Sequence, residues 1–94
     1  MNVFALRIGA DHPSLPGHFP GRPVVPGVVL LDEVAAHLPA PVSRIAQVKF
    51  VSPLLPGQDA RIELDIDETS RRARFRVLRD ETLLASGDLQ FGAP

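Results

Sequence analysis

Alternation of apolar and polar residues marks most of the second half of the chain. The three clearest segments run over residues 61–67, 72–77 and 83–91, and each places apolar or small side chains at every second position. A period of two is typical of strands with one face buried and the other in water. Less regular stretches over 43–51 and 3–8 add two further strands. The pattern therefore predicts a largely antiparallel sheet.

One helix is predicted, over residues 28–38. Its sequence, VVLLDEVAAHL, is apolar all round in the first turn, and Pro39 and Pro41 after it cannot continue a helix. A helix of this kind is normally enclosed by other parts of the protein, so we expect Asp32 to lie among apolar side chains. One helix against a largely antiparallel sheet makes the fold class α+β.

Prolines concentrate in the segment before the helix. Five of the ten prolines of the chain fall between residues 12 and 27, with three glycines among them. No helix or central strand tolerates that spacing, so the segment is expected to be a long loop stiffened by proline. Long loops inside compact domains are usually functional or disordered.

Size and composition exclude several classes of protein. We expect the 94 residues to form one domain, residues 1–94. A chain this short buries only about 60–65% of its unfolded surface, which favours a homo-oligomer. The 10 basic and 11 acidic residues nearly cancel, which argues against nucleic acid and gives no reason to expect a membrane surface. Without cysteine there is neither a disulfide nor a thiolate metal site. Since no secretory signal or membrane-length apolar run is found, a cytoplasmic location is expected.

Opposite charges occupy the outward positions of two neighbouring predicted strands: Glu63, Asp65 and Asp67 against Arg72, Arg74 and Arg76. Facing pairs of this kind stabilise an antiparallel sheet by a few tenths to about 1 kcal/mol each. A solvated ladder of ion pairs is the simpler interpretation. The alternative is a surface on which an acidic partner docks.

Two segments resemble a known family. GHFPGRPVVPGVVLLD, residues 17–32, resembles the signature of the 3-hydroxyacyl-acyl carrier protein dehydratases of the FabA/FabZ type, and VKFVSPLLPG, residues 48–57, is similar to their strand and turn. The resemblance implies a hot-dog fold, in which a curved antiparallel sheet wraps a central helix. It also implies a homodimer with shared active sites, a 3-hydroxyacyl thioester on acyl carrier protein as substrate, a 2-enoyl thioester and water as products, and no metal or organic cofactor.

The same resemblance assigns the catalytic residues. His18 matches the catalytic histidine, Asp32 the catalytic carboxylate and Gly27 the backbone donor at the helix start. The chemistry suits these residues, because histidine titrates near neutral pH and can remove an α-proton. Free N–H groups around Gly27 and Val28 can stabilise the enolate-like oxygen. A buried carboxyl can protonate the leaving hydroxyl, with Glu33 as the rival of Asp32 for this role.

Other residues are expected around this site. Phe19 and Phe50 are predicted to lie in the core or in the wall of a substrate tunnel. Arg22 is the first candidate for contact with the acidic carrier protein, ahead of Arg44, Lys49 and the arginines between residues 71 and 79. Glu33 and His37, one helical turn apart, are expected to be an exposed pair and not a metal site, since no third ligand is apparent.

Several alternatives stay open. Aspartate at the acid position matches the FabA branch, whereas the loop is closer to FabZ, and the chain is short for either. Fatty-acid, polyketide and aryl-polyene pathways are therefore all compatible with it. A hot-dog acyl thioesterase and a non-catalytic acyl-binding partner subunit are the alternative functions, because a fold does not by itself determine chemistry.

Overall fold

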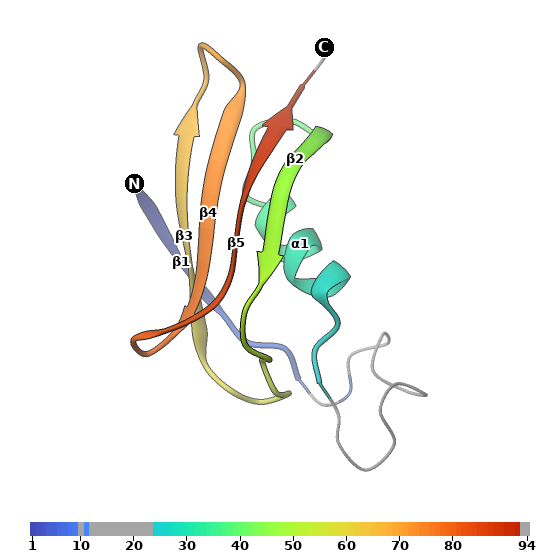
Figure 1. Ribbon diagram of the computed structural model, residues 1–94, viewed down its shortest axis with the longest axis vertical. Coiled ribbons are helices and arrows are strands. Elements are labelled where there is room, and N and C mark those ends of the chain that lie inside the picture. Colours follow the sequence, from blue (N-terminus) through green and yellow to red (C-terminus); the bar gives the residue numbers. More distant parts are fainter. Residues whose placement is uncertain (10, 12–23, 93–94) are drawn as a thin grey trace.

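Five strands and one helix make up the described part of the chain. The computed structural model describes residues 1–9, 11 and 24–92. The strands pair antiparallel in the order β1-β3-β4-β5-β2, and α1 lies against one face of the sheet, behind β5 and β2 in Figure 1. The elements are β1 (Asn2–Leu6), α1 (Gly27–Ala35), β2 (Val42–Phe50), β3 (Ala60–Asp67), β4 (Arg72–Arg79) and β5 (Thr82–Phe91). The predicted α+β fold is confirmed, with bounds shifted by a few residues.

The inner face of the sheet carries the apolar half of the alternating pattern. Along β4, for example, Ala73, Phe75 and Val77 are buried, while the arginines between them are exposed. β3 and β5 contribute further buried side chains to the same core, which α1 covers. Because β-strand residues alternate between two faces, the polar half of the pattern lies on the outer face.

The predicted facing of acidic and basic residues on the outer face is confirmed. Register places Glu63 opposite Arg76, Asp65 opposite Arg74 and Asp67 opposite Arg72. The side chains do not all pair along this register, however, since Arg74 Nε lies 3.0 Å from Asp88 Oδ1 on β5. Such exposed pairs contribute only about 0–1 kcal/mol each to the free energy of unfolding.

α1 is shorter than the sequence predicts. Pro26 precedes it with φ −60°, and Val29, Leu30 and Val34 are its buried residues. After Ala35 the α-helical hydrogen bonds give way to a tighter 3₁₀-type turn, in which the N–H of Leu38 donates to the carbonyl oxygen of Ala35, three residues back, at 3.1 Å. In the described residues no helix is long and apolar enough to cross a membrane.

Gly87 allows β2 to approach β5 closely. A Cβ atom at this buried position would lie 2.5 Å from the carbonyl oxygen of Gln47 and 2.7 Å from Phe75 Cε1. β2 departs from regular pairing between Ile45 and Gln47, directly beside this contact. Glycine is therefore required at position 87, because the backbone of β2 cannot easily move away from an added side chain.

Replacing Gly87 with alanine should destabilise the protein by about 1–3 kcal/mol, because the added methyl group overpacks the contact with β2. Chemical denaturation measures the change in the free energy of unfolding. The neighbouring variant Ser86→Ala, on a half-exposed residue, is the control and should stay within about 0.5 kcal/mol of the wild type. Equal stability of Gly87→Ala and the wild type would contradict the contact.

Candidate active site

Free backbone donors lie at the beginning of α1. The carbonyl oxygen of Pro26 accepts the N–H groups of Val29 and Leu30, at 3.0 and 3.4 Å. The N–H groups of Gly27 and Val28 precede these and have no backbone acceptor among the described residues. The first N–H groups of a helix point out of its N-terminal end, where the helix dipole favours negative charge. This end of α1 can therefore accept an oxygen that gains negative charge.

An apolar cavity of about 540 Å³ opens beside these donors. α1, the segment before it and the segment after β2 enclose it. The buried residues Val25, Leu30 and Leu54 line the cavity, together with Gly27, Val28 and Phe50. An apolar cavity with a few converging polar groups is typical of a small-molecule site.

Phe50 lies directly over the start of α1. A Cβ atom at Gly27 would stand 2.5 Å from Phe50 Cζ, so the ring occupies the space that any larger residue would need. Phe50 is nevertheless 55% exposed. The prediction that Phe50 belongs to the core is wrong, and the alternative prediction, the wall of a cavity, matches its position. The reason is that, among residues 1–9, 11 and 24–92, no segment covers β2 on this side.

Asp32 lies one helical turn beyond Val28 on the same side of α1. It is exposed, and Val28 is 61% exposed. The predicted burial of Asp32, and the enclosure of the first turn, are wrong for the single chain, because this face of α1 points away from the sheet. Glu33, the rival acid, is half-buried.

Three predicted site residues, His18, Phe19 and Arg22, lie outside the described residues. Of the predicted site, the structure brings together Gly27, Val28 and Phe50 around one cavity.

His37 is not half of an exposed pair, as the sequence suggested. Its ring stacks on that of Phe4 in β1, with centroids 3.8 Å apart and planes at 12°, and the residue is half-buried. The stack ties the turn that follows α1 to an edge strand. Sequence reasoning missed it because the two residues are far apart along the chain.

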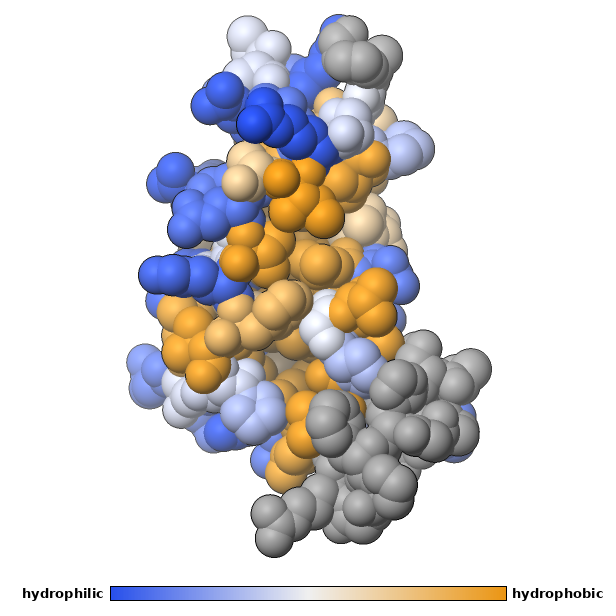
Figure 2. All heavy atoms as spheres, turned by 45° about the vertical axis from the view of Figure 1, so that its right-hand side comes forward, coloured by the Kyte–Doolittle hydropathy of each residue, from blue (hydrophilic) through white to orange (hydrophobic). Residues whose placement is uncertain are grey.

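A continuous apolar band runs down the side of the molecule where α1 meets β2 (Figure 2). The large exposed apolar residues of this region are Val28, Ile45, Phe50 and Val51. β2 is also an edge strand, since β5 is its one neighbour in the sheet of the described residues. Exposed apolar patches next to an unpaired edge commonly mark an interface between proteins.

Comparison with known proteins agrees with this architecture. A family model described as ApeI-like, ApeI dehydratase, matches residues 2–88. The 3-hydroxyacyl-[acyl-carrier-protein] dehydratase FabZ of Herpetosiphon aurantiacus is 31% identical, with 90% of this chain and 72% of that protein aligned. FabZ of Desulforamulus reducens is 32% identical over 90% of this chain and 71% of that protein.

Solved structures give the same result. The dehydratase heterocomplex ApeI:P from Xenorhabdus doucetiae superposes with a TM-score of 0.87 at 27% identity, covering 97% of this chain and 86% of that chain. An uncharacterised protein from Erwinia carotovora subsp. atroseptica superposes with a TM-score of 0.79 at 26% identity, covering 96% and 81%. The predicted hot-dog fold is confirmed. The chain belongs to the ApeI-like dehydratase family and is a hot-dog dehydratase related to FabZ.

Proposed function

We propose that this chain converts a 3-hydroxyacyl thioester on an acyl carrier protein to the 2-enoyl thioester and water. The observation that carries the proposal is the pair of free N–H donors of Gly27 and Val28 at the mouth of an apolar cavity. The names of the FabZ relatives supply the substrate class.

In the proposed reaction, the thioester carbonyl oxygen accepts hydrogen bonds from the start of α1. His18 takes the α-proton, and the electrons of that C–H bond form the carbon–carbon double bond as the bond from C3 to its hydroxyl breaks. The hydroxyl leaves as water with a proton from Asp32. The N–H groups contribute because their hydrogen bonds to the carbonyl oxygen strengthen as negative charge develops on it.

The proposed proton donor needs to be covered, and the described residues of one chain leave it exposed. Carboxyl groups hold a proton near neutral pH only when they are withdrawn from water. Asp32 and Val28 are exposed on the same face of α1, beside the apolar band at β2. We propose that a second hot-dog subunit pairs with the free edge of β2 and covers this face.

Two kinds of second subunit fit the edge of β2. A second copy of this chain is the simpler choice, and it completes two equivalent sites by symmetry. The solved ApeI:P structure is described as a heterocomplex, so a related dehydratase subunit is the alternative. The acyl group that the enzyme accepts determines whether it serves a fatty-acid, polyketide or aryl-polyene pathway. The cytoplasmic location stays a prediction.

Replacing either proposed proton-transfer residue should abolish dehydration while the protein stays folded. His18→Ala and Asp32→Asn are each expected to lower turnover by about 10²–10⁴-fold, since each removes a positioned acid or base. Enoyl absorbance measures dehydration, and release of free thiol would instead identify a thioesterase. Glu33→Gln is the matched control and should keep most of the activity. If Glu33→Gln is inactive and Asp32→Asn is active, the proton donor is Glu33.

Mixing the two inactive variants tests whether the site is shared between subunits. With random exchange, half of the dimers are mixed and each has one intact site, so about a quarter of wild-type activity should return. Sedimentation of each variant alone establishes that both are dimers. No recovery from subunits shown to exchange would place both residues of a site on one chain.

The interface can be tested with two exposed apolar residues on opposite edges of the sheet. Ile45 on β2 is 54% exposed and Val3 on β1 is 55% exposed. Ile45→Glu should give an inactive monomer, because it puts a charge into the apolar band, whereas Val3→Glu should leave the dimer and its activity intact. Sedimentation velocity and turnover measure the two effects. If Ile45→Glu remained an active dimer, the interface would not lie at the edge of β2.

Gly27→Ala should impair dehydration more than it impairs folding. The added methyl group displaces the Phe50 ring, which is exposed enough to turn away, so the free energy of unfolding should change by less than about 1 kcal/mol. Turnover should fall by at least about tenfold, because the ring or the methyl group obstructs the thioester carbonyl. Comparison with Phe50→Ala and the double variant separates the two causes. Recovery in the double variant assigns the loss to the ring, and full activity of Gly27→Ala contradicts the close approach.

A further inference from the structure

One wall of the proposed cavity is a segment without regular secondary structure. Residues 51–54, which we call the wall segment, follow β2 and line the cavity at four consecutive positions. Leu54 is 1% exposed, so the wall segment is anchored in the core. The carbonyl oxygen of Leu54 accepts the N–H of Val25 at 2.8 Å, and Gly27 follows two residues later. The wall segment therefore holds the chain where it enters α1.

An extra residue in β5 supports the beginning of the wall segment. The pairing of β4 with β5 shifts at Leu84, which lies between the paired residues Leu83 and Ala85 but has no facing residue on β4. Its carbonyl oxygen accepts the N–H groups of Val51 and Ser52, at 2.8 and 3.2 Å. Irregular strand residues of this kind often occur next to active sites. The irregularity of β5 thus fixes one end of the wall segment.

Arg79, the last residue of β4, holds the other end. Its Nη1 atom donates to the carbonyl oxygen of Pro53 at 3.1 Å and to Oε1 of Gln58 at 3.0 Å. The same Gln58 oxygen accepts the N–H of Leu55 at 3.0 Å. One nitrogen of Arg79 is therefore bonded both to the wall segment and to the bend that follows it over residues 55–58.

These hydrogen bonds account for the guanidinium of Arg79. Arg79 is half-buried, and within residues 1–9, 11 and 24–92 no ion pair joins it to a carboxylate. A cation that is partly withdrawn from water is stable where its donors find acceptors. Hydrogen bonds from a charged donor are also stronger than those between neutral groups. We therefore expect the two bonds of Arg79 to hold the wall segment firmly.

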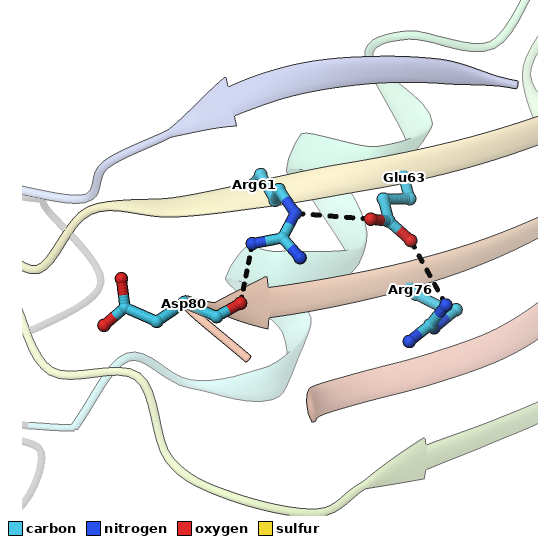
Figure 3. A network of polar contacts seen from close by, with 4 residues as sticks. All are labelled: Arg61, Glu63, Arg76 and Asp80. Atoms are coloured by element: carbon cyan, nitrogen blue, oxygen red, sulfur yellow. Dashed lines mark hydrogen bonds and ion pairs between the residues drawn. The ribbon is translucent and has the colours of Figure 1, made fainter. Parts of the chain in front are cut away.

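A second arginine, Arg61 of β3, supports the turn that follows β4. Its Nη1 donates to the carbonyl oxygen of Asp80 at 2.7 Å, directly after Arg79 in the chain. Its Nε lies 3.2 Å from Glu63, which also pairs with Arg76 at 3.3 Å (Figure 3). These bonds of Arg61 end on the turn and on the sheet, and not on the wall segment. Arg61 and Arg79 thus hold the same turn, but Arg79 alone of the two is bonded to the wall of the cavity.

We propose that Arg79 is a positioning residue, which holds the wall segment and, through it, the N–H donors at the start of α1. The path runs from the guanidinium to the Pro53 carbonyl, along the chain to Leu54, and from the Leu54 carbonyl to the N–H of Val25. The inference rests on the proposed function, in which the N–H of Gly27 meets a reacting oxygen. Because a displacement of about 1 Å can lower a rate by about 100-fold, this path bears on catalysis.

Amide hydrogen exchange tests the path without a substrate. Arg79→Met keeps an apolar stem but removes the donors, so the start of α1 should open locally more often. The protection of the Val25 N–H, relative to that of Phe75 in the central strand β4, should fall by about tenfold. A substitution that only destabilises the whole fold would lower the protection of Phe75 at least as much as that of Val25.

Turnover of a short soluble 3-hydroxyacyl thioester tests the consequence for the reaction. Rates are expressed per folded molecule, so a smaller folded fraction does not change them. Arg79→Met should lower kcat by about tenfold and leave KM within about threefold, because the misplaced donors act mainly in the transition state. Arg79→Lys should recover most of kcat, since both bonds come from one nitrogen and an ammonium group also carries several donors.

Gln58 offers a matched pair of variants at the other side of the contact. Gln58→Glu keeps an oxygen that can accept from Arg79 and from the N–H of Leu55, so it should retain more of kcat than Gln58→Met does. The double variant Arg79→Met, Gln58→Met should be little worse than Arg79→Met alone, because the shared contact can be lost only once. If Arg79→Met does not fold, the two Gln58 variants decide the question.

Arg61→Met is the control, because it removes a donor to the backbone of the same turn without touching the wall segment. Its kcat per folded molecule should stay within about twofold of the wild type. An equal loss in Arg61→Met would overturn the proposal in favour of general support of the turn. Wild-type kcat in folded Arg79→Met, or unchanged relative protection of Val25, would also overturn it.

Failure of the proposed function would look different. If the wild type dehydrates no 3-hydroxyacyl thioester, the proposed reaction is refuted, whereas Arg79-dependent protection of Val25 would still support the positioning of α1. Dehydration with a kcat and a Val25 protection that ignore Arg79 would refute the positioning role and support the reaction.

Discussion

Packing of one short helix against the inner face of the sheet is the contact on which the rest of the structure depends. Val29, Leu30 and Val34 join the buried residues of the sheet in one core. α1 has no side-chain cap, no acidic residue in its first turn and no basic residue in its last. A helix of nine residues is unstable alone in water, so burial holds it in place. The same burial fixes the N–H donors of Gly27 and Val28 beside β2 and the cavity.

Strand and helix positions could be predicted because each segment carries its own period. The exposure of Asp32 and Phe50 could not be predicted. Apolar residues next to them in the sequence indicate that a surface is buried, but not whether the same chain or another chain buries it. The stack of His37 on Phe4 depends on how the ends of two distant elements meet, which local patterns do not encode. The positions of Gly27 and Val28 at the helix start were predictable because Pro26 and the apolar run mark that boundary.

β2 contributes to two different surfaces. Val48 and Phe50 point toward the apolar side, whereas Lys49 between them points toward the outer face, because successive strand residues alternate. A slip of one residue would exchange the two sets of side chains. The irregular pairing between Ile45 and Gln47, held by the close approach at Gly87, therefore fixes which side chains meet the cavity and which meet water.

The strand order has a consequence for how the chain folds. β3, β4 and β5 form a meander of sequential neighbours, but β1 pairs with β3 and β2 with β5, so Asn2 meets Leu64 and Val42 meets Phe91. Contacts between distant residues form slowly, because a long loop must close before they stabilise anything. During synthesis the first strand and the helix leave the ribosome before the strands that cover them. The meander of β3, β4 and β5 needs only short loops to close, whereas the apolar side chains of α1 are synthesised before the strands that bury them and are exposed to aggregation until then.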